Sequence, residues 1–123
     1  MDDALTMTKA LADGNRIRVV MALSEREELC ACQITELLGV TGATASRHLS
    51  ILTNANLIST RKSGRWVHYR LLRDQKASAA LLDWLISSVG PTEANKTDRA
   101  RLEKIVACNP EDLCREQRNS KCC

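Results

Sequence analysis

The sequence is poor in aromatic residues and has no long apolar run. Its 123 residues include no Phe, one Tyr and two Trp, so aliphatic side chains must build any core. No apolar run approaches the ~20 residues that a membrane-spanning helix needs. The first residues, MDDALTMTKAL, are acidic and amphipathic, which is unlike a secretory signal peptide. We therefore expect a cytoplasmic protein.

Length and composition predict one domain with an appendage. With 44% apolar and 27% charged residues, the chain is typical of globular proteins. Residues 1–90 are expected to form the domain, and residues 91–123 a polar tail that holds four of the six cysteines. In a reducing compartment so many cysteines indicate metal or redox chemistry rather than structural disulfides.

Acidic residues are missing from one long stretch. Residues 37–73 contain six basic residues and no acidic ones, which gives this segment a charge of +6. The rest of the chain holds the other 12 of the 18 basic residues and all 15 acidic ones, so the overall charge is only +3. Such a concentration of charge predicts a cationic surface that suits nucleic acid. Its basic residues are Arg47, Arg61, Lys62, Arg65, Arg70 and Arg73.

The stretch begins with the pattern of a helix that has one apolar and one polar face. Ala45, Leu49 and Leu52 recur at helical spacing, and the Thr41 hydroxyl can cap the start of the helix. The preceding residues 33–38 are expected to form another helix that ends at Gly39, which gives a helix-turn-helix. The polar face of the second helix carries hydrogen-bonding or basic side chains, which are Thr44, Ser46, Arg47 and Ser50.

After this helix the apolar period becomes two. Residues 58–61 and 66–71 alternate as strands do, and residues 62–65 predict a hairpin turn in which Gly64 takes a positive φ. A polar helix followed by a basic hairpin predicts a mainly α fold with a β-hairpin wing, the winged helix-turn-helix. Its helix would lie in the major groove, while Lys62 and Arg65 would meet phosphates or the minor groove.

Further helices are predicted over residues 2–12, 16–23 and 75–89. The last of these has a broad apolar stripe that could pair with its own copy, together with the first helix, to form a homodimer; packing against the core alone is the alternative. Beyond Pro91 a short amphipathic helix is predicted over residues 98–107, and the final stretch is expected to be mobile or ordered by a ligand. The stripe consists of Leu81, Leu82, Leu85, Ile86 and Val89.

Four segments together resemble one known family. LADGNRIRVVMAL, ELCACQITELLGV, TASRHLSIL and GRWVHYRL are similar to the ArsR/SmtB winged-helix repressors, in their arsenic-responsive branch, over residues 4–90. The resemblance implies a homodimeric repressor, not an enzyme, that leaves operator DNA when a thiophilic ion binds. It implies DNA contact for Ser46, Arg47 and His48, although His48 could instead pack between helices. It implies inducer ligation for Cys30 and Cys32.

The chain departs from the family in its cysteine pattern. The segment Leu-Cys-x-Cys at residues 29–32 is the cysteine box of this family. Arsenite sensors with the full box carry a third Cys where this sequence has Thr35, so the cysteine box here offers two thiolates. Residues 75–89 contain no His, which argues against the zinc site of the other branch. We expect no permanent cofactor and an inducer that contains trivalent arsenic or antimony, since both are soft and thiolates select soft ions.

Trivalent arsenic has three positions to fill, and the box fills two. A third sulfur could come from Cys108, Cys114, Cys122 or Cys123, or an organoarsenical could bring a carbon in its place. Residues two apart on a helix point about 200° apart, so ligation by both Cys30 and Cys32 should favour an unwound segment 29–33. Two other functions stay open, namely a thiol redox switch using Cys30 and Cys32 or the tail, and a metalloid carrier that hands its ion to a pump.

Overall fold

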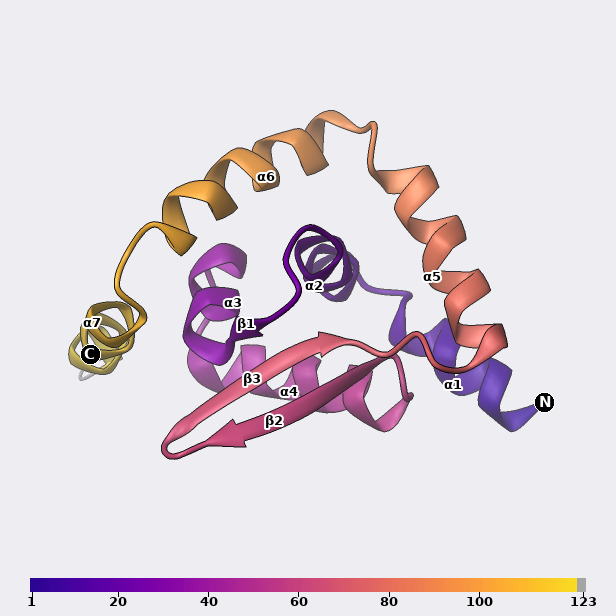
Figure 1. The fold of residues 1–123 in the computed structure, drawn as a ribbon, viewed down its shortest axis with the longest axis horizontal. Coiled ribbons are helices and arrows are strands. Elements are labelled where there is room, and N and C mark those ends of the chain that lie inside the picture. Colours follow the sequence, from indigo (N-terminus) through magenta and orange to yellow (C-terminus); the bar gives the residue numbers. More distant parts are fainter. Residues whose placement is uncertain (122–123) are drawn as a thin grey trace.

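Seven helices and three strands follow one another in residues 1–121, which the computed structural model describes (Figure 1). None of these helices has the length and apolarity that crossing a membrane demands. In chain order the elements are α1 (Asp2–Ala10), α2 (Gly14–Glu25), β1 (Leu29–Cys30), α3 (Ala31–Leu38), α4 (Gly42–Asn54), β2 (Ile58–Ser63), β3 (Trp66–Leu71), α5 (Lys76–Val89), α6 (Glu93–Val106) and α7 (Pro110–Lys121).

The predicted helix-turn-helix is confirmed in α3 and α4. Gly39 ends α3 with φ of 67°, a conformation that glycine adopts without a Cβ clash. The Thr41 hydroxyl then caps α4 by accepting from the N–H of Thr44 at 3.2 Å. The apolar face of α4 is buried as expected, which leaves its polar face outward. Its buried side chains are Ala45, His48, Leu49 and Leu52.

Two helix starts differ from the prediction. Helix α2 begins at Gly14, two residues before the predicted start, because Asp13 caps it by accepting from the N–H groups of Asn15 and Arg16. Burial alone would raise the pKa of Asp13, but these hydrogen bonds bring it below its ordinary value. Helix α3 begins at Ala31, two residues earlier than predicted, and therefore includes Cys32.

The hairpin is part of a three-stranded antiparallel sheet in the order β1-β3-β2. Strands β2 and β3 pair from Ile58–Leu71 to Ser63–Trp66, so the wing turns on Gly64 and Arg65, with Gly64 at φ of 61°. No local pattern indicated the two-residue strand β1, whose Cys30 pairs with His68. This third strand joins the cysteine box directly to the wing.

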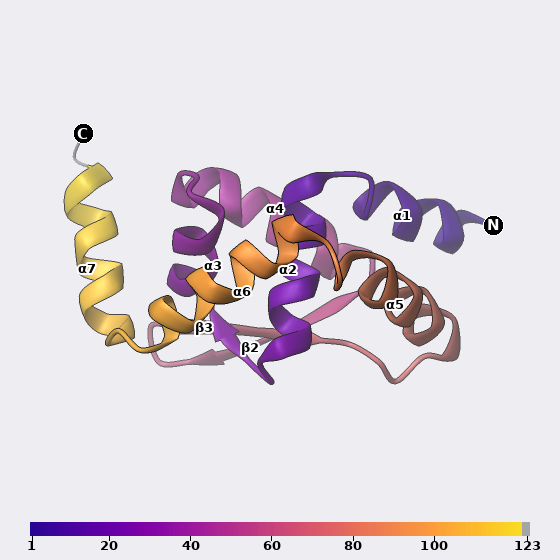
Figure 2. The same ribbon diagram turned by 90° about the horizontal axis from the view of Figure 1, so that it is seen from above.

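The chain after the wing forms helices: the final stretch, expected to be mobile or ordered by a ligand, is helical from Pro110 to Lys121. Helix α6 is longer than the predicted 98–107, contacts α2 and α3, and buries Leu102 and Ile105. Helix α7 contacts α3 and buries Leu113. Figures 1 and 2 both place α7 at the opposite end of the molecule from α1 and α5.

The core lies between the helix-turn-helix, the sheet and the later helices. Leu82 and Leu85 of the predicted stripe are buried in it, while Leu81, Ile86 and Val89 are only partly covered. Leu5 on α1 and Trp84 on α5 remain 47% and 63% exposed. Both core packing and an apolar surface are thus present on α5. The largest fully buried apolar side chains are Val19, Val20, Ile34, Leu37, Leu49, Leu52, Leu57, Ile58 and Leu82.

Candidate nucleic-acid interface and cysteine site

The outward face of α4 is open to solvent. Thr44, Ser46, Arg47 and Ser50 are all exposed, as their alternation with the buried residues of the helix requires. No carboxylate in the part of the chain that the structure describes lies within ion-pair distance of Arg47. A free guanidinium between small hydroxyl side chains is suited to the acceptor groups of a base edge or a phosphate.

His48 is on the other side of α4. Its side chain is 9% exposed, and its Nδ1 lies 3.2 Å from Nη1 of Arg16. Nε of Arg16 donates in turn to the carbonyl of Ala10. The observed role of His48 is thus to tie α4 to the junction of α1 and α2, which is the packing alternative; its contact with DNA stays a prediction.

The wing is held at Arg61 by an acidic residue that lies just before β1. Glu28 accepts from Nη2 and Nε of Arg61 at 2.6 Å and 3.0 Å. This hydrogen bonding from Arg61 lowers the pKa of Glu28 below its ordinary value. The same carboxylate lies 3.7 Å from Nδ1 of His68, so His68 has a structural position at the sheet.

The tip of the wing reaches α7. Lys62 and Arg65 are exposed as predicted, but Nη2 of Arg65 lies 2.6 Å from Oε1 of Glu111. The Arg65 guanidinium is also 5.7 Å from the centre of the Trp66 ring. The sequence indicated a phosphate contact at Arg65, whereas the structure has an internal carboxylate at that position.

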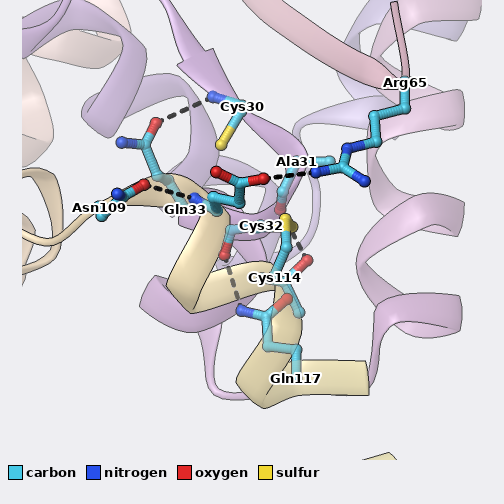
Figure 3. The surroundings of a disulfide bond; sticks show 10 residues. Cys30, Ala31, Cys32, Gln33, Arg65, Asn109, Cys114 and Gln117 are labelled. Carbon is cyan, nitrogen blue, oxygen red and sulfur yellow. Dashed lines mark hydrogen bonds and ion pairs between the residues drawn. A yellow bond between two sulfur atoms is a disulfide. The ribbon is translucent and has the colours of Figure 1, made fainter. Parts of the chain in front are cut away.

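Two of the candidate cysteines meet between α3 and α7. Cys32 in the first turn of α3 forms a disulfide with Cys114 of α7, although 82 residues separate them (Figure 3). Their Cα atoms are 5.4 Å apart, within the usual range for a disulfide. The Gln117 side chain also donates to the carbonyl of Cys32 at 2.8 Å. The amino-terminal turn of α3 is therefore fixed to α7 by a covalent and a polar link.

Cys30 is close in sequence but has a different environment. It ends β1, is 2% exposed and has a free thiol, while its N–H donates to the Gln33 side chain at 3.0 Å. A surface groove of about 420 Å³ reaches Cys30 between the wing and the start of α7. Trp66 and His68 line it on the wing side, and Pro110 and Glu111 on the α7 side.

The remaining cysteines do not join this cluster. Cys108 is free and exposed, and its Sγ lies 3.5 Å from the carbonyl of Lys104. Cys122 and Cys123 lie outside the described residues. Within residues 1–121 no three Cys, His, Asp or Glu side chains are grouped closely enough to hold an ion. The arrangement thus presents one joined sulfur pair with a third thiol nearby in the chain.

Sequence reasoning missed Glu111 and Gln117, which fix α7 to the wing and to α3. One signal was present, because Pro110 followed by Glu111 and Asp112 is a typical helix start. Nothing local in the sequence indicated that this helix would return to the cysteine box.

Comparison with known proteins places these features in a family. Residues 13–60 match the model of the bacterial regulatory proteins of the arsR family. The arsenical resistance operon repressor of Escherichia coli K12 is 43% identical over 67 residues, which are 54% of this chain and 57% of that protein. The repressor of the same name from Bacillus subtilis 168 is 39% identical over 77 residues, 63% of this chain and 72% of its own length.

A solved structure extends the likeness to the fold. The homodimeric winged helix-turn-helix DNA-binding domain of Mb0332 from Mycobacterium bovis, a possible ArsR-family regulator, superposes with a TM-score of 0.62 and 25% identity. The superposition covers 75% of this chain and 82% of that domain. The chain thus spans a little over half the length of the Escherichia coli relative and most of the Mycobacterium domain.

Proposed function

The chain belongs to the ArsR family of bacterial regulatory proteins, and from this premise we propose that it is a metalloid-released transcriptional repressor. It binds operator DNA as a homodimer through α4 and the wing, and leaves the DNA when cysteine sulfurs bind a trivalent arsenical or antimonial. The names of the Escherichia coli and Bacillus subtilis relatives support arsenic as the inducer. Arg47 with Thr44, Ser46 and Ser50 reads the major groove, and Lys62 and Arg65 contact the backbone.

The observation that carries the inducer proposal is the position of Cys114 beside Cys32. When both are reduced, two thiols are held together by the contact of α7 with α3. A trivalent arsenic hydroxide exchanges one hydroxide for each sulfur, and each exchange releases one water. Two such exchanges satisfy a monosubstituted organoarsenical, whose carbon already fills the third position.

This geometry changes which cysteines are the preferred candidates for the first two ligands. Cys30 and Cys32 were the expected pair, but Cys32 meets Cys114 while Cys30 is buried at the end of β1. We propose Cys32 and Cys114 as the first two ligands of the inducer. Cys30, reached from the groove beside it, supplies the third sulfur for inorganic arsenite once the junction of β1 and α3 unwinds.

The site is connected to α4 through α3. The carbonyl groups at the end of α3 accept from two arginines, Arg18 on the carbonyl of Leu37 at 2.8 Å and Arg101 on that of Glu36 at 3.1 Å. Arg101 lies on α6, so a shift of α3 against α6 would alter the turn at Gly39 and the orientation of α4. Release requires that the inducer bind the displaced arrangement more tightly than the DNA-binding one.

The dimer would form at the end of the molecule remote from α7. The exposed Leu5 and Trp84 lie on α1 and α5, the helices expected to pair with their copies. The homodimeric Mb0332 domain supports this assembly.

Mass spectrometry of the reduced protein tests the inducer site. The protein is incubated with a trivalent phenylarsenical or with arsenite, and its free thiols are counted. We expect one arsenic per chain, with loss of two thiols for the phenylarsenical and three for arsenite. Cys114→Ser should lose phenylarsenical binding, whereas Cys108→Ser should keep it as the matched control. Equal binding by both variants would contradict the assignment.

The disulfide itself favours a second candidate function, a redox-sensing repressor on the same scaffold. Hydrogen peroxide would oxidise the thiols of Cys32 and Cys114 to the disulfide. The peroxide takes up the two electrons and two protons that the thiols lose and becomes two waters. Release of DNA by peroxide in the absence of arsenic, reversed by dithiothreitol, would support this role. DNA affinity unchanged by oxidation would exclude it.

A further inference from the structure

We propose that α7 competes with DNA for the wing: Glu111 binds Arg65, the predicted phosphate contact, and is held there whenever Cys32 and Cys114 are bridged. The inference rests on the proposed function for the role of the wing in DNA binding. It adds a second route from the cysteines to the DNA surface, one that bypasses α4.

The geometry joins the bridge and the ion pair on one short segment. Glu111 and Cys114 are three residues apart on α7, so they lie on neighbouring positions of the same helical face. Glu111 Oε1 is 2.6 Å from Arg65, and Cys114 is bonded to Cys32. In Figure 3 the Arg65 side chain extends toward the segment that carries both residues. A single rigid turn therefore transmits the state of the cysteines to the wing tip.

The first turn of α7 is capped from within the chain. The Glu111 N–H donates to the Asn109 side chain at 2.9 Å, which orients the first turn. A carboxylate in the first turn is also favoured by the helix dipole, which supports the position of Glu111 beside Arg65. The wing thus faces the Glu111 carboxylate on a capped helical turn.

Among the residues whose side chains the structure describes, few contacts other than the bridge hold α7 in place. The contacts are the buried Leu113, the hydrogen bond from Gln117 to Cys32 and the Arg65–Glu111 pair, whose side chains are 63% and 51% exposed. Exposed ion pairs are weak and are screened by salt. A covalent bridge across 82 residues removes the entropy of the freed segment and so favours docking. Bridging by a disulfide or by arsenic therefore converts an occasional contact into a lasting one.

The expected consequence is a change in salt dependence. While Glu111 neutralises Arg65, the wing loses one phosphate contact and places a carboxylate near the DNA. Each phosphate contact contributes about 0.9 to the slope of log K against log salt, so two wings of a dimer contribute roughly two units. The bridged protein should thus bind DNA more weakly and with a shallower salt dependence than the reduced protein.

The test uses the full-length protein oxidised with hydrogen peroxide, with no arsenical present. The DNA is a labelled duplex that the reduced wild-type protein has selected from a random-sequence pool. Disulfide formation is checked by mass spectrometry, and affinity is measured by fluorescence anisotropy over a range of salt. Oxidised Glu111→Gln should bind roughly threefold to tenfold more tightly than the oxidised wild type and regain the steeper slope.

Two matched variants serve as controls for this result. Glu116→Gln removes the same charge from α7 at an exposed position that is not paired with Arg65, and should behave as wild type. Adding Arg65→Ala to Glu111→Gln should abolish the gain, because the competed contact is then missing. A gain of equal size in Glu116→Gln, or no gain in Glu111→Gln at any salt, would overturn the proposal.

The outcomes that would refute the proposed function differ from those that would refute the role of Glu111. If arsenicals leave the thiols of the reduced protein free, the inducer site is refuted while the oxidised comparison still decides the role of Glu111. If the reduced protein selects no DNA from the pool, the DNA-binding function is refuted, and the competition proposal with it.

Discussion

The recognition helix α4 and the wing differ in what their arginines already bind. Arg47 on α4 has no carboxylate within reach among the described residues, so its charge is free. On the wing, Arg61 is bound by Glu28 and Arg65 by Glu111. The difference indicates that the cationic surface has a permanent part on α4 and a conditional part on the wing. The part on the wing is paired directly with a residue of α7, the helix that carries Cys114.

The largest effect is expected when the response to arsenicals and peroxide is removed. Cys32→Ser should leave DNA binding by the reduced protein unchanged but abolish release by a trivalent phenylarsenical and by peroxide. A serine oxygen is a hard, protonated and poor ligand for soft arsenic, and it forms no disulfide. Anisotropy of labelled DNA during each titration measures release, with Cys108→Ser as the control. Normal release by Cys32→Ser would place the sensing site elsewhere.

The permanent part of the surface is tested next. Arg47→Ala should weaken operator binding by about 1–3 kcal/mol if Arg47 reads a base, and by the same amount in the reduced and oxidised proteins. Arg99→Ala, on the exposed surface of α6, is the control for loss of one positive charge. An unchanged affinity of Arg47→Ala at moderate salt would remove this residue from the interface.

The conditional part should respond more weakly and in one state only. Arg65→Ala should lower affinity for all sequences about equally and reduce the salt slope of the reduced dimer by roughly two units, as loss of one phosphate contact on each wing does. In the oxidised protein the same substitution should have little further effect, because Glu111 already binds Arg65. A selective loss for one operator would show instead that the wing reads bases.

The smallest effect concerns the pH dependence of the Glu28–Arg61 pair. The folded-state pKa of Glu28 is lowered, mainly by the hydrogen bonds from Arg61, so its stabilising contribution is present above the ordinary glutamate pKa. That contribution is lost as the pH falls through the lowered value. Glu28→Gln should therefore reduce the thermal midpoint slightly near neutral pH, and the two proteins should converge in acid. A difference that persists unchanged in acid would assign the effect to packing rather than charge.

Local pattern was enough to predict α4 and the hairpin. The spacing of Ala45, Leu49 and Leu52, the Thr41 cap and Gly64 each depend on a few neighbouring residues, and each is confirmed. These features require only helical and strand periodicity and the conformational freedom of glycine. The same locality allowed the polar face of α4 to be placed correctly.

Pattern failed where distant segments decide the outcome. The two-residue strand β1 exists because β3 offers a free edge, and α7 is ordered by contacts with α3 and the wing. Helix α7 has little apolar content, with Leu113 as its single leucine, so its sequence did not indicate that it packs on the core. The pairing of Cys32 with Cys114 is a long-range contact that spacing could not select from the open alternatives.

The most direct test of the account is release of DNA from reduced Cys114→Ser by a trivalent phenylarsenical. The variant is compared with wild type and with Cys108→Ser, each bound to the same labelled duplex. If Cys32 and Cys114 form the inducer site and fasten α7, Cys114→Ser stays on the DNA at phenylarsenical concentrations that release the other two proteins. Release of Cys114→Ser at the wild-type concentration would contradict the account, since it would show that the inducer site forms without Cys114.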